Sequence, residues 1–357
     1  MKLADHHTSR VLSAWRRPRL GTATLVSGAL VAAAALAVTG CSSAGGHADS
    51  LALAGADSST MQMSSSLTGS YQVVTLNDGR DLTFNQLLGI NNEGVIAGYF
   101  GSGAAGHPNK GYMLRPPFAQ RDFRNENFPG AKQTQVIGIN DHGVTVGFWS
   151  TQNTASMANN NFGFYSVGGR FFPVNFPTGD NAKPPVNQLL GINNNGVAVG
   201  FYTNGGGSNR GYEFNIRTHR FTRVTVPGAP GGTAAPSLTA AGINDRGDVA
   251  GFYNKTANTV DAFLKLHSGR FITLAFPGAT MTQAFGVNDS DVVVGSYTTG
   301  SGNAAVTHGF IWRGGSFASV DIGGASSTTI NGVNDEGDLV GFYTDAKGNT
   351  DGLLALP

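Results

Sequence analysis

One phrase recurs six times along the 357-residue chain and limits the folds open to it. Its clearest form is GINNEGVIAGYF, which begins at Gly89. The other copies begin, at intervals of 44 to 53 residues, at Gly138, Gly191, Gly242, Gly286 and Gly332. Tandem repetition on this scale is typical of proteins built from similar supersecondary units, each of which packs against its neighbours. The chain must therefore fold as a repeat architecture.

Each full repeat contains four short strand signals separated by turn residues. The first strand ends in the Gly-Ile-Asn of the phrase, and a four-residue turn rich in Asn and Gly leads into the second strand. The second strand is apolar on both faces, as in 144–149 (VTVGFW), which predicts that it is covered on both sides. A glycine within it, such as Gly98 or Gly147, indicates a bulge or a close backbone approach.

The two ends of the repeat region are complementary fragments. The last repeat has only three strand signals and ends with 353–356, whereas an isolated strand signal, 71–76, precedes the first phrase. Pairing of this first strand with the last repeat would close a ring. We therefore predict an all-β fold over residues 70–357, a six-bladed β-propeller of four-stranded antiparallel blades closed by the N-terminal strand joining the C-terminal blade. A linear solenoid would instead need capping repeats.

Residues 1–40 have the features of an export signal. Basic residues up to Arg19 precede an uncharged run over 20–38, and Cys41, the single cysteine of the chain, follows two small residues. This pattern resembles a bacterial lipoprotein signal peptide, in which Cys41 would be lipidated and become the new N-terminus. An uncleaved transmembrane helix is the alternative, because the uncharged run is nearly long enough to span a bilayer. Arg16-Arg17 leaves open whether export follows the general or the twin-arginine route.

The segment between the signal and the first strand is small, polar and aperiodic, so we expect a flexible linker over 41–69. The predicted location is the extracytoplasmic face of the cell membrane, held by lipid on Cys41, with release as a secreted protein as the alternative. After residue 40 the chain has 18 basic and 21 acidic residues, which argues against a nucleic-acid partner. A lone cysteine excludes an intramolecular disulfide, and we expect a monomer.

The repeat phrase and a degenerate His-Ala-Phe triplet resemble the HAF-repeat family of bacterial extracellular proteins. The nearest copy of the triplet is 308–310 (HGF), and more distant copies are 261–263 (DAF) and 110–112 (KGY). The resemblance covers about residues 71–355. It implies an exported repeat protein and carries no catalytic residue over to this chain.

Other motifs give weak indications of chemistry. The stretch 101–106 (GSGAAG) matches a dinucleotide fingerprint, but it joins two predicted strands and no helix follows, so we interpret it as a loop. The phrases at 244–248 and 334–338 suggest calcium, although each turn offers about three oxygens and calcium takes six to eight. No pair of histidines has metal-ligand spacing. We predict no metal and no cofactor.

The loops between second and third strands are long and differ between repeats, whereas the turns at the other ends of the strands are short and uniform. In a propeller these two sets lie on opposite faces, so we predict that a ligand contacts the long-loop face near the channel mouth. Aromatic residues that end second strands there, Phe100, Trp149 and Tyr202, are candidate stacking groups, with packing between blades as the alternative.

Two functions remain open from the sequence. Our main prediction is a non-catalytic binding or interaction module whose partner is a glycan or another component of the cell envelope. The alternative is a propeller enzyme, a hydrolase or lyase acting on glycans at the central channel. Acidic or histidine side chains that converge on the axis would favour the enzyme, and an axis lined by Gly, Ile and Asn alone would favour the binder.

The anchor is testable with one substitution. Cys41→Ser removes the thiol that would carry the lipid, so we expect both lipid attachment and processing to stop. Because stable anchoring requires more than one acyl chain, the variant should also lose its stable attachment to the membrane. Metabolic lipid labelling combined with detergent-phase partitioning measures this. Unchanged labelling in the variant would exclude Cys41 as the modified residue.

Overall fold

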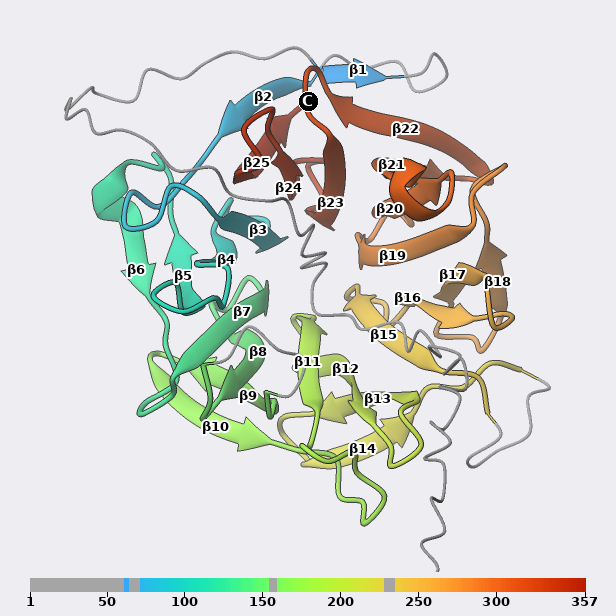
Figure 1. Ribbon diagram of the computed structural model, residues 1–357. Coiled ribbons are helices and arrows are strands. Elements are labelled where there is room, and N and C mark those ends of the chain that lie inside the picture. The colour runs from blue at the N-terminus through green and yellow to red at the C-terminus, as the bar shows by residue number, and fades with distance from the viewer. Residues whose placement is uncertain (1–60, 64–70, 154–158, 228–234) are drawn as a thin grey trace, which may run out of the picture.

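The computed structural model describes residues 61–63, 71–153, 159–227 and 235–357 (Figure 1). The predicted signal peptide, Cys41 and most of the predicted linker lie outside these ranges. Within the linker, Met61–Met63 form strand β1, which differs from the unstructured segment that we expect there. The described chain is built from strands, with two short 3-10 turns, η1 (Gln120–Asp122) and η3 (Gly302–Ala304), and it contains no helix long and apolar enough to cross a bilayer.

Strand pairing forms four four-stranded antiparallel sheets and one nine-stranded sheet, in which a single parallel pair, Val260↔Met281, joins two further four-stranded antiparallel units. We call the four sheets and these two units blades 1 to 6. Blade 1 comprises β3 (Asn85–Ile90), β4 (Ile96–Phe100), β5 (Lys110–Leu114) and β6 (Phe123–Asn125). Blade 2 comprises β7 (Gln133–Ile139), β8 (Thr145–Ser150), β9 (Phe162–Val167) and β10 (Arg170–Val174). Blade 3 comprises β11 (Asn187–Ile192), β12 (Val197–Thr203), β13 (Asn209–Asn215) and β14 (Arg220–Arg223).

The second half of the chain repeats this pattern. Blade 4 comprises β15 (Leu238–Ile243), β16 (Val249–Asn254), β17 (Val260–Lys265) and β18 (Phe271–Leu274). Blade 5 comprises β19 (Met281–Val287), β20 (Val293–Thr299), β21 (Val306–Arg313) and β22 (Ser316–Ile322), and β1 adds to its outer edge. Blade 6 comprises β23 (Ser327–Val333), β24 (Leu339–Thr344), β25 (Thr350–Leu356) and β2 (Gln72–Thr75).

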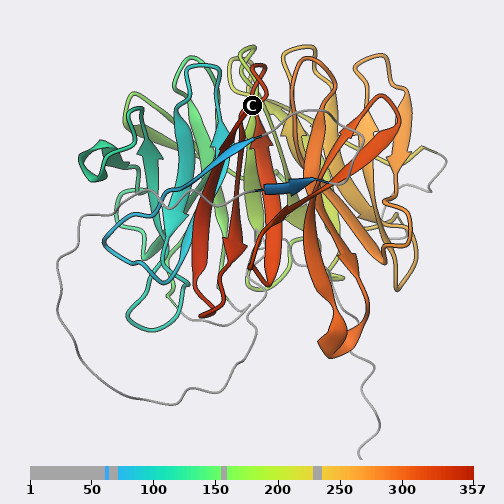
Figure 2. The same cartoon turned by 90° about the horizontal axis from the view of Figure 1, so that it is seen from above.

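The blades stand around a common axis, with the first strand of each innermost (Figure 1). Figure 2 shows the strands running between two faces that carry the loops. β2 pairs with β25 from Gln72↔Leu356 to Thr75↔Leu353, so the first strand of the propeller completes the last blade. The prediction of an all-β propeller closed in this way is confirmed.

Every first strand carries a bulge at the repeat phrase, seen as a register shift such as that between Leu87 and Gly89. Opposite each bulge lies the glycine of the second strand. A Cβ atom at Gly98 would lie 2.3 Å from the carbonyl oxygen of Gln86, and the equivalent distance at Gly147 is 2.0 Å. Only glycine allows the two strands to approach this closely. The predicted link between this glycine and a bulge is confirmed.

An apolar cluster surrounds the axis. It joins Leu88, Ile137, Leu190 and Ala241 of the first strands to aromatic residues of the second strands, and Phe285 of blade 5 packs against it. The remaining core clusters lie mainly between neighbouring blades. Because strand pairing is largely confined within blades, this side-chain packing is what joins one blade to the next.

Ring closure predicts a difference between two deletions at the N-terminus. Removing 70–77 takes away Val73 and Leu76, which are buried, and exposes the edge of β25. We expect a loss of unfolding free energy on the order of 5 kcal/mol. Removing 42–60 serves as the control and should leave the thermal midpoint unchanged. Equal melting temperatures for the two proteins would contradict closure by β2.

Candidate functional site at the axis

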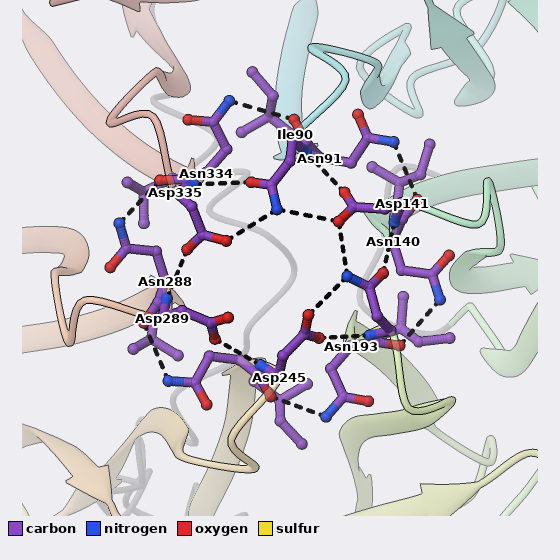
Figure 3. Close-up of a pocket in the computed structure, with 18 residues that line it drawn as sticks. Ile90, Asn91, Asn140, Asp141, Asn193, Asp245, Asn288, Asp289, Asn334 and Asp335 are labelled. Carbon is purple, nitrogen blue, oxygen red and sulfur yellow. Dashed lines mark hydrogen bonds between the residues drawn. The ribbon is translucent and has the colours of Figure 1, made fainter.

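A pocket of about 70 Å³ opens where the six turns between first and second strands meet (Figure 3). Each repeat phrase contributes three consecutive residues: an Ile or Val, an Asn, and then an Asn or Asp. The pocket therefore lies on the face of the uniform turns, opposite the long-loop face where we predict ligand contacts. Sequence reasoning assigned these Asn and Asp residues to turn formation and did not foresee that six copies would form one polar site.

The first polar residue of each turn belongs to a closed ring of buried asparagines, called the asparagine ring. Asn140 shows the pattern. Its Oδ1 accepts the N–H groups of His142 (3.1 Å) and Val144 (2.9 Å), which holds its own turn. Its Nδ2 donates to the carbonyl oxygen of Asn193 in the next blade, at 3.0 Å.

The same bond between blades recurs at every junction. The donor and acceptor pairs are Asn91 to Asn140, Asn140 to Asn193, Asn193 to Asn244, Asn244 to Asn288, Asn288 to Asn334 and Asn334 to Asn91, at 2.9 to 3.3 Å. The last pair links blade 6 to blade 1. The asparagine ring therefore closes across the two ends of the chain.

The next residue of each turn forms a second closed ring at the pocket, called the axial ring. Its members are Asn92, Asp141, Asn194, Asp245, Asp289 and Asp335. The backbone N–H of each member donates to the Oδ1 of the next, at 2.7 to 2.9 Å. The axial ring thus gathers four carboxylates and two carboxamides, and our criterion of acids converging on the axis is met (Figure 3).

The four carboxylates of the axial ring are not equivalent. Oδ2 of Asp141 accepts amide hydrogens from both Asn92 (3.0 Å) and Asn194 (2.7 Å). Asp245 and Asp335 each receive one such bond, from Asn194 and Asn92 respectively. Asp289 lies between these two acids and has no amide neighbour in the axial ring, so its Oδ2 has no hydrogen-bond partner among the described residues.

The surroundings of Asp289 favour its protonated form. Burial raises the pKa of Asp289, the carboxylates of Asp335 and Asp245 raise it further, and the N–H of Asp245 and the Arg246 guanidinium oppose these effects. Arg246 is itself bound to Asp248 at 2.8 Å and to Asp291. Its charge is therefore shared among several carboxylates. Asp289 is the ring member with both a free oxygen and a raised pKa.

The turns considered for calcium are capped by protein groups instead. Asp248 and Asp338 accept hydrogen bonds from the side chains of Asn244 and Asn334, both at 3.0 Å. Among the described residues there is no group of three His, Cys, Asp or Glu side chains arranged to hold a metal ion. Residues 101–106 lie in the loop between β4 and β5, in agreement with our interpretation of that glycine-rich stretch.

The candidate stacking residues lie between blades and away from the axial ring. Trp149 of blade 2 stacks on Phe128, which follows the outer strand of blade 1, with ring centroids 4.3 Å apart. Tyr202 of blade 3 stacks in the same way on Phe176, at 4.8 Å. Phe100 is buried beneath the guanidinium of Arg80. All three pack at junctions between blades, and their role as ligand-contacting groups stays a prediction.

Comparisons with known proteins leave the family open. No protein-family model and no curated protein sequence matches the chain, so the resemblance to HAF-repeat proteins stays a prediction. A gluconolactonase from Xanthomonas campestris is similar in structure, with 12% identity, a TM-score of 0.49, and coverage of 85% of this chain and 96% of its own.

Two further similar structures are an ulvan lyase and a sialidase. The ulvan lyase shares 14% identity over 79% of this chain and 86% of its own, with a TM-score of 0.43. The sialidase, from Trypanosoma rangeli, shares 9% identity over 76% of this chain and 53% of its own, with a TM-score of 0.45. Likeness at this level concerns the fold alone and transfers no catalytic residue.

Our main prediction of a non-catalytic binding module is nevertheless contradicted. The axial ring brings acids together on the axis, which is the criterion that we set for the alternative of a propeller enzyme. The error has a physical origin in the sequence reasoning. No pair of carboxylates stands out along the chain, because successive acids of the axial ring are 44 to 104 residues apart and only the ring brings them together.

The asparagine ring predicts that truncating one small side chain will lower the unfolding free energy substantially. Asn140→Ala leaves the buried N–H of Val144 without a partner and removes one of the two hydrogen bonds to the carbonyl of Asn193, so we expect a loss of about 1–3 kcal/mol in unfolding free energy. His142→Ala, at an exposed position of the same turn, is the control and should change stability by less than about 0.5 kcal/mol. Denaturant titration measures both. Similar midpoints would contradict a structural role for the ring.

Proposed function

We propose that the protein is a glycan hydrolase whose reaction takes place at the axial ring. The observation that carries the proposal is the convergence of Asp141, Asp245, Asp289 and Asp335 on one pocket, where Asp289 alone has an oxygen that no described residue binds. An acid of raised pKa beside a second carboxylate is the combination that glycosidases use to cleave a glycosidic bond.

Asp289 is suited to the role of proton donor. In its protonated form it would give the proton to the glycosidic oxygen as the bond from that oxygen to the anomeric carbon breaks. A neighbouring carboxylate, Asp245 or Asp335, would take a proton from the water that adds to the same carbon. Arg246 would then moderate the negative charge that remains in the ring.

Charge favours hydrolysis over lyase chemistry here. A polysaccharide lyase of uronate polymers must bind a substrate carboxylate, and the axial ring would repel such a group because it already holds four carboxylates. Arg246, a cation beside Asp289, is already bound to Asp248 and Asp291. A neutral or amino-bearing glycan fits this electrostatic environment better.

We also propose that the enzyme is held outside the cytoplasm by lipid on Cys41. The support for this location is the signal-like pattern of residues 1–41. A site on the outer side of the membrane would have direct access to polysaccharides of the cell envelope or of the surroundings.

The proposal is testable with Asp289→Asn. The amide keeps the oxygen that accepts the N–H of Asp245, just as the side-chain oxygens of Asn194 and Asn92 accept the N–H groups of neighbouring turns, but it cannot deliver the proton. We expect release of reducing ends from chitosan or a neutral glucan to fall at least about 100-fold. Glu336→Gln, an exposed position on the same face, is the matched control and should retain activity.

Stability should change in the opposite direction to activity. Because the folded-state pKa of Asp289 is raised, the folded protein holds this proton more tightly, and stability falls as the pH rises through that pKa. Asp289→Asn removes this penalty, so the variant should melt higher at neutral pH and lose its advantage as the pH falls to the ordinary value of 3.8. Full activity in the variant, or no cleavage of any neutral or amino-bearing glycan by the unaltered protein, would refute the proposed site.

A further inference from the structure

Blade 5 contains a connected set of polar side chains at its long-loop end, on the face of the molecule opposite the axial ring. Nδ1 of His308 lies 2.9 Å from Oδ1 of Asp321, and Nε2 lies 3.3 Å from Oγ1 of Thr299. The second oxygen of Asp321 accepts the hydroxyl of Ser319 at 2.9 Å, and Ser319 lies 2.8 Å from the hydroxyl of Tyr297.

The sheet register explains why these side chains meet. Tyr297, His308 and Asp321 occupy directly opposed positions on β20, β21 and β22, since Tyr297 pairs with His308 and the neighbouring Gly309 pairs with Val320. Thr299 lies two residues beyond Tyr297 and therefore on the same face of β20. Three adjacent strands thus supply one row of functional groups.

The direction of each hydrogen bond follows from the carboxylate at one end. Ionised Asp321 can only accept, so His308 donates from Nδ1 and Ser319 donates its hydroxyl. Tyr297 must then donate to Ser319, because the Ser319 proton is already committed. In neutral imidazole the proton on Nδ1 leaves Nε2 as an acceptor, and it receives the hydroxyl of Thr299.

Aromatic stacking also holds the imidazole ring of His308 in place. Its ring stacks on Tyr297 with centroids 4.9 Å apart and an interplanar angle of 22°. Tyr297 stacks in turn on Phe276 of blade 4, at 3.6 Å and 3°. The side chain of His308 remains 24% exposed, and the chain passes directly from Thr299 into the exposed loop 300–305. The group is held in place and is open to solvent at its Thr299 end.

The propeller itself does not require this arrangement. The position opposite the end of the second strand, where blade 5 has His308, is occupied in the other blades by Lys110, Phe162, Arg210, Asp261 and Asp351. These residues occupy the same register position as His308 but carry different functional groups. The His–Asp pair with a hydroxyl at its free nitrogen is a property of blade 5.

We propose that Thr299, His308 and Asp321 form a nucleophilic triad that hydrolyses small acyl esters, independently of the axial ring. A hydroxyl on imidazole Nε2 with a carboxylate on Nδ1 is the arrangement of a hydroxyl nucleophile, its base and the group that orients the base. Because threonine is a secondary alcohol whose methyl group crowds the reacting carbon, the site is suited to a short acyl group such as acetyl.

The reaction would proceed in two balanced halves. Thr299 Oγ1 bonds to the acyl carbon as its proton passes to Nε2 of His308, and the ester C–O bond breaks while that proton goes to the departing alcohol oxygen. Water then adds to the acyl carbon by the same route, which breaks the bond to Thr299 and restores its hydroxyl. Asp321 stabilises the imidazolium formed in each half, and Ser319 and Tyr297 act as positioning residues.

The experiment uses p-nitrophenyl acetate with the unaltered protein and a set of variants. Intact-mass and peptide analysis after rapid quenching should find one acetyl group on Thr299. Thr299→Ala should abolish this adduct, and His308→Gln and Asp321→Asn should slow turnover at least about 100-fold. Thr299→Ser should keep or raise the rate, because serine is the less crowded nucleophile.

Two controls separate this site from folding effects and from the axial ring. Thr298→Ala changes the neighbouring threonine on the opposite face of β20 and should leave the rate unchanged. Asp289→Asn should also leave it unchanged, whatever that variant does to glycan cleavage. Acetylation of another residue, equal turnover by Thr299→Ala, or no turnover by the folded protein would overturn the proposal.

Discussion

The hydrogen bond from each asparagine side chain to the next blade is the interaction on which the rest of the structure depends. One carboxamide completes its own turn through Oδ1 and reaches the neighbouring turn through Nδ2, so local and long-range structure are fixed by the same group. A buried amide that satisfies both functions has no equivalent among other side chains of this size. This explains why the Asn of the phrase occurs in all six copies, whereas the residue after it varies between Asn and Asp.

The variation at that next position creates the chemical asymmetry of the pocket. Two amides disperse the charge near Asp141, whereas Asp245, Asp289 and Asp335 follow one another without an intervening amide. A symmetric scaffold thereby obtains one carboxyl group unlike the rest. The same principle applies in blade 5, where a shared register position holds a histidine in place of the residues found in other blades.

Much of the fold could be predicted from the sequence because its causes are local and repeated. A single repeat displays the glycine opposite the bulge and the Asn-rich turn, and each of them imposes a local physical constraint. The isolated strand at 71–76 adds a third constraint, since it needs a partner. The candidate site could not be predicted in this way. Asp289 looks like any turn residue in its own repeat, and its raised pKa arises from burial and from Asp335 and Asp245, which belong to other blades. His308 and Asp321 are separated by a hairpin, and Thr299 gains significance only once the register of β20 and β21 is known.

The junction between blades 6 and 1 has a consequence for where the ends of the chain could be placed. Asn334 and Asp335 bond to Asn91 and Asn92 as their counterparts do at the five other junctions, although no covalent connection crosses between these turns. The axial contacts therefore do not depend on where the polypeptide starts. A circularly permuted gene, with the present ends joined and new ends opened in a loop such as 204–208, would encode the same set of rings.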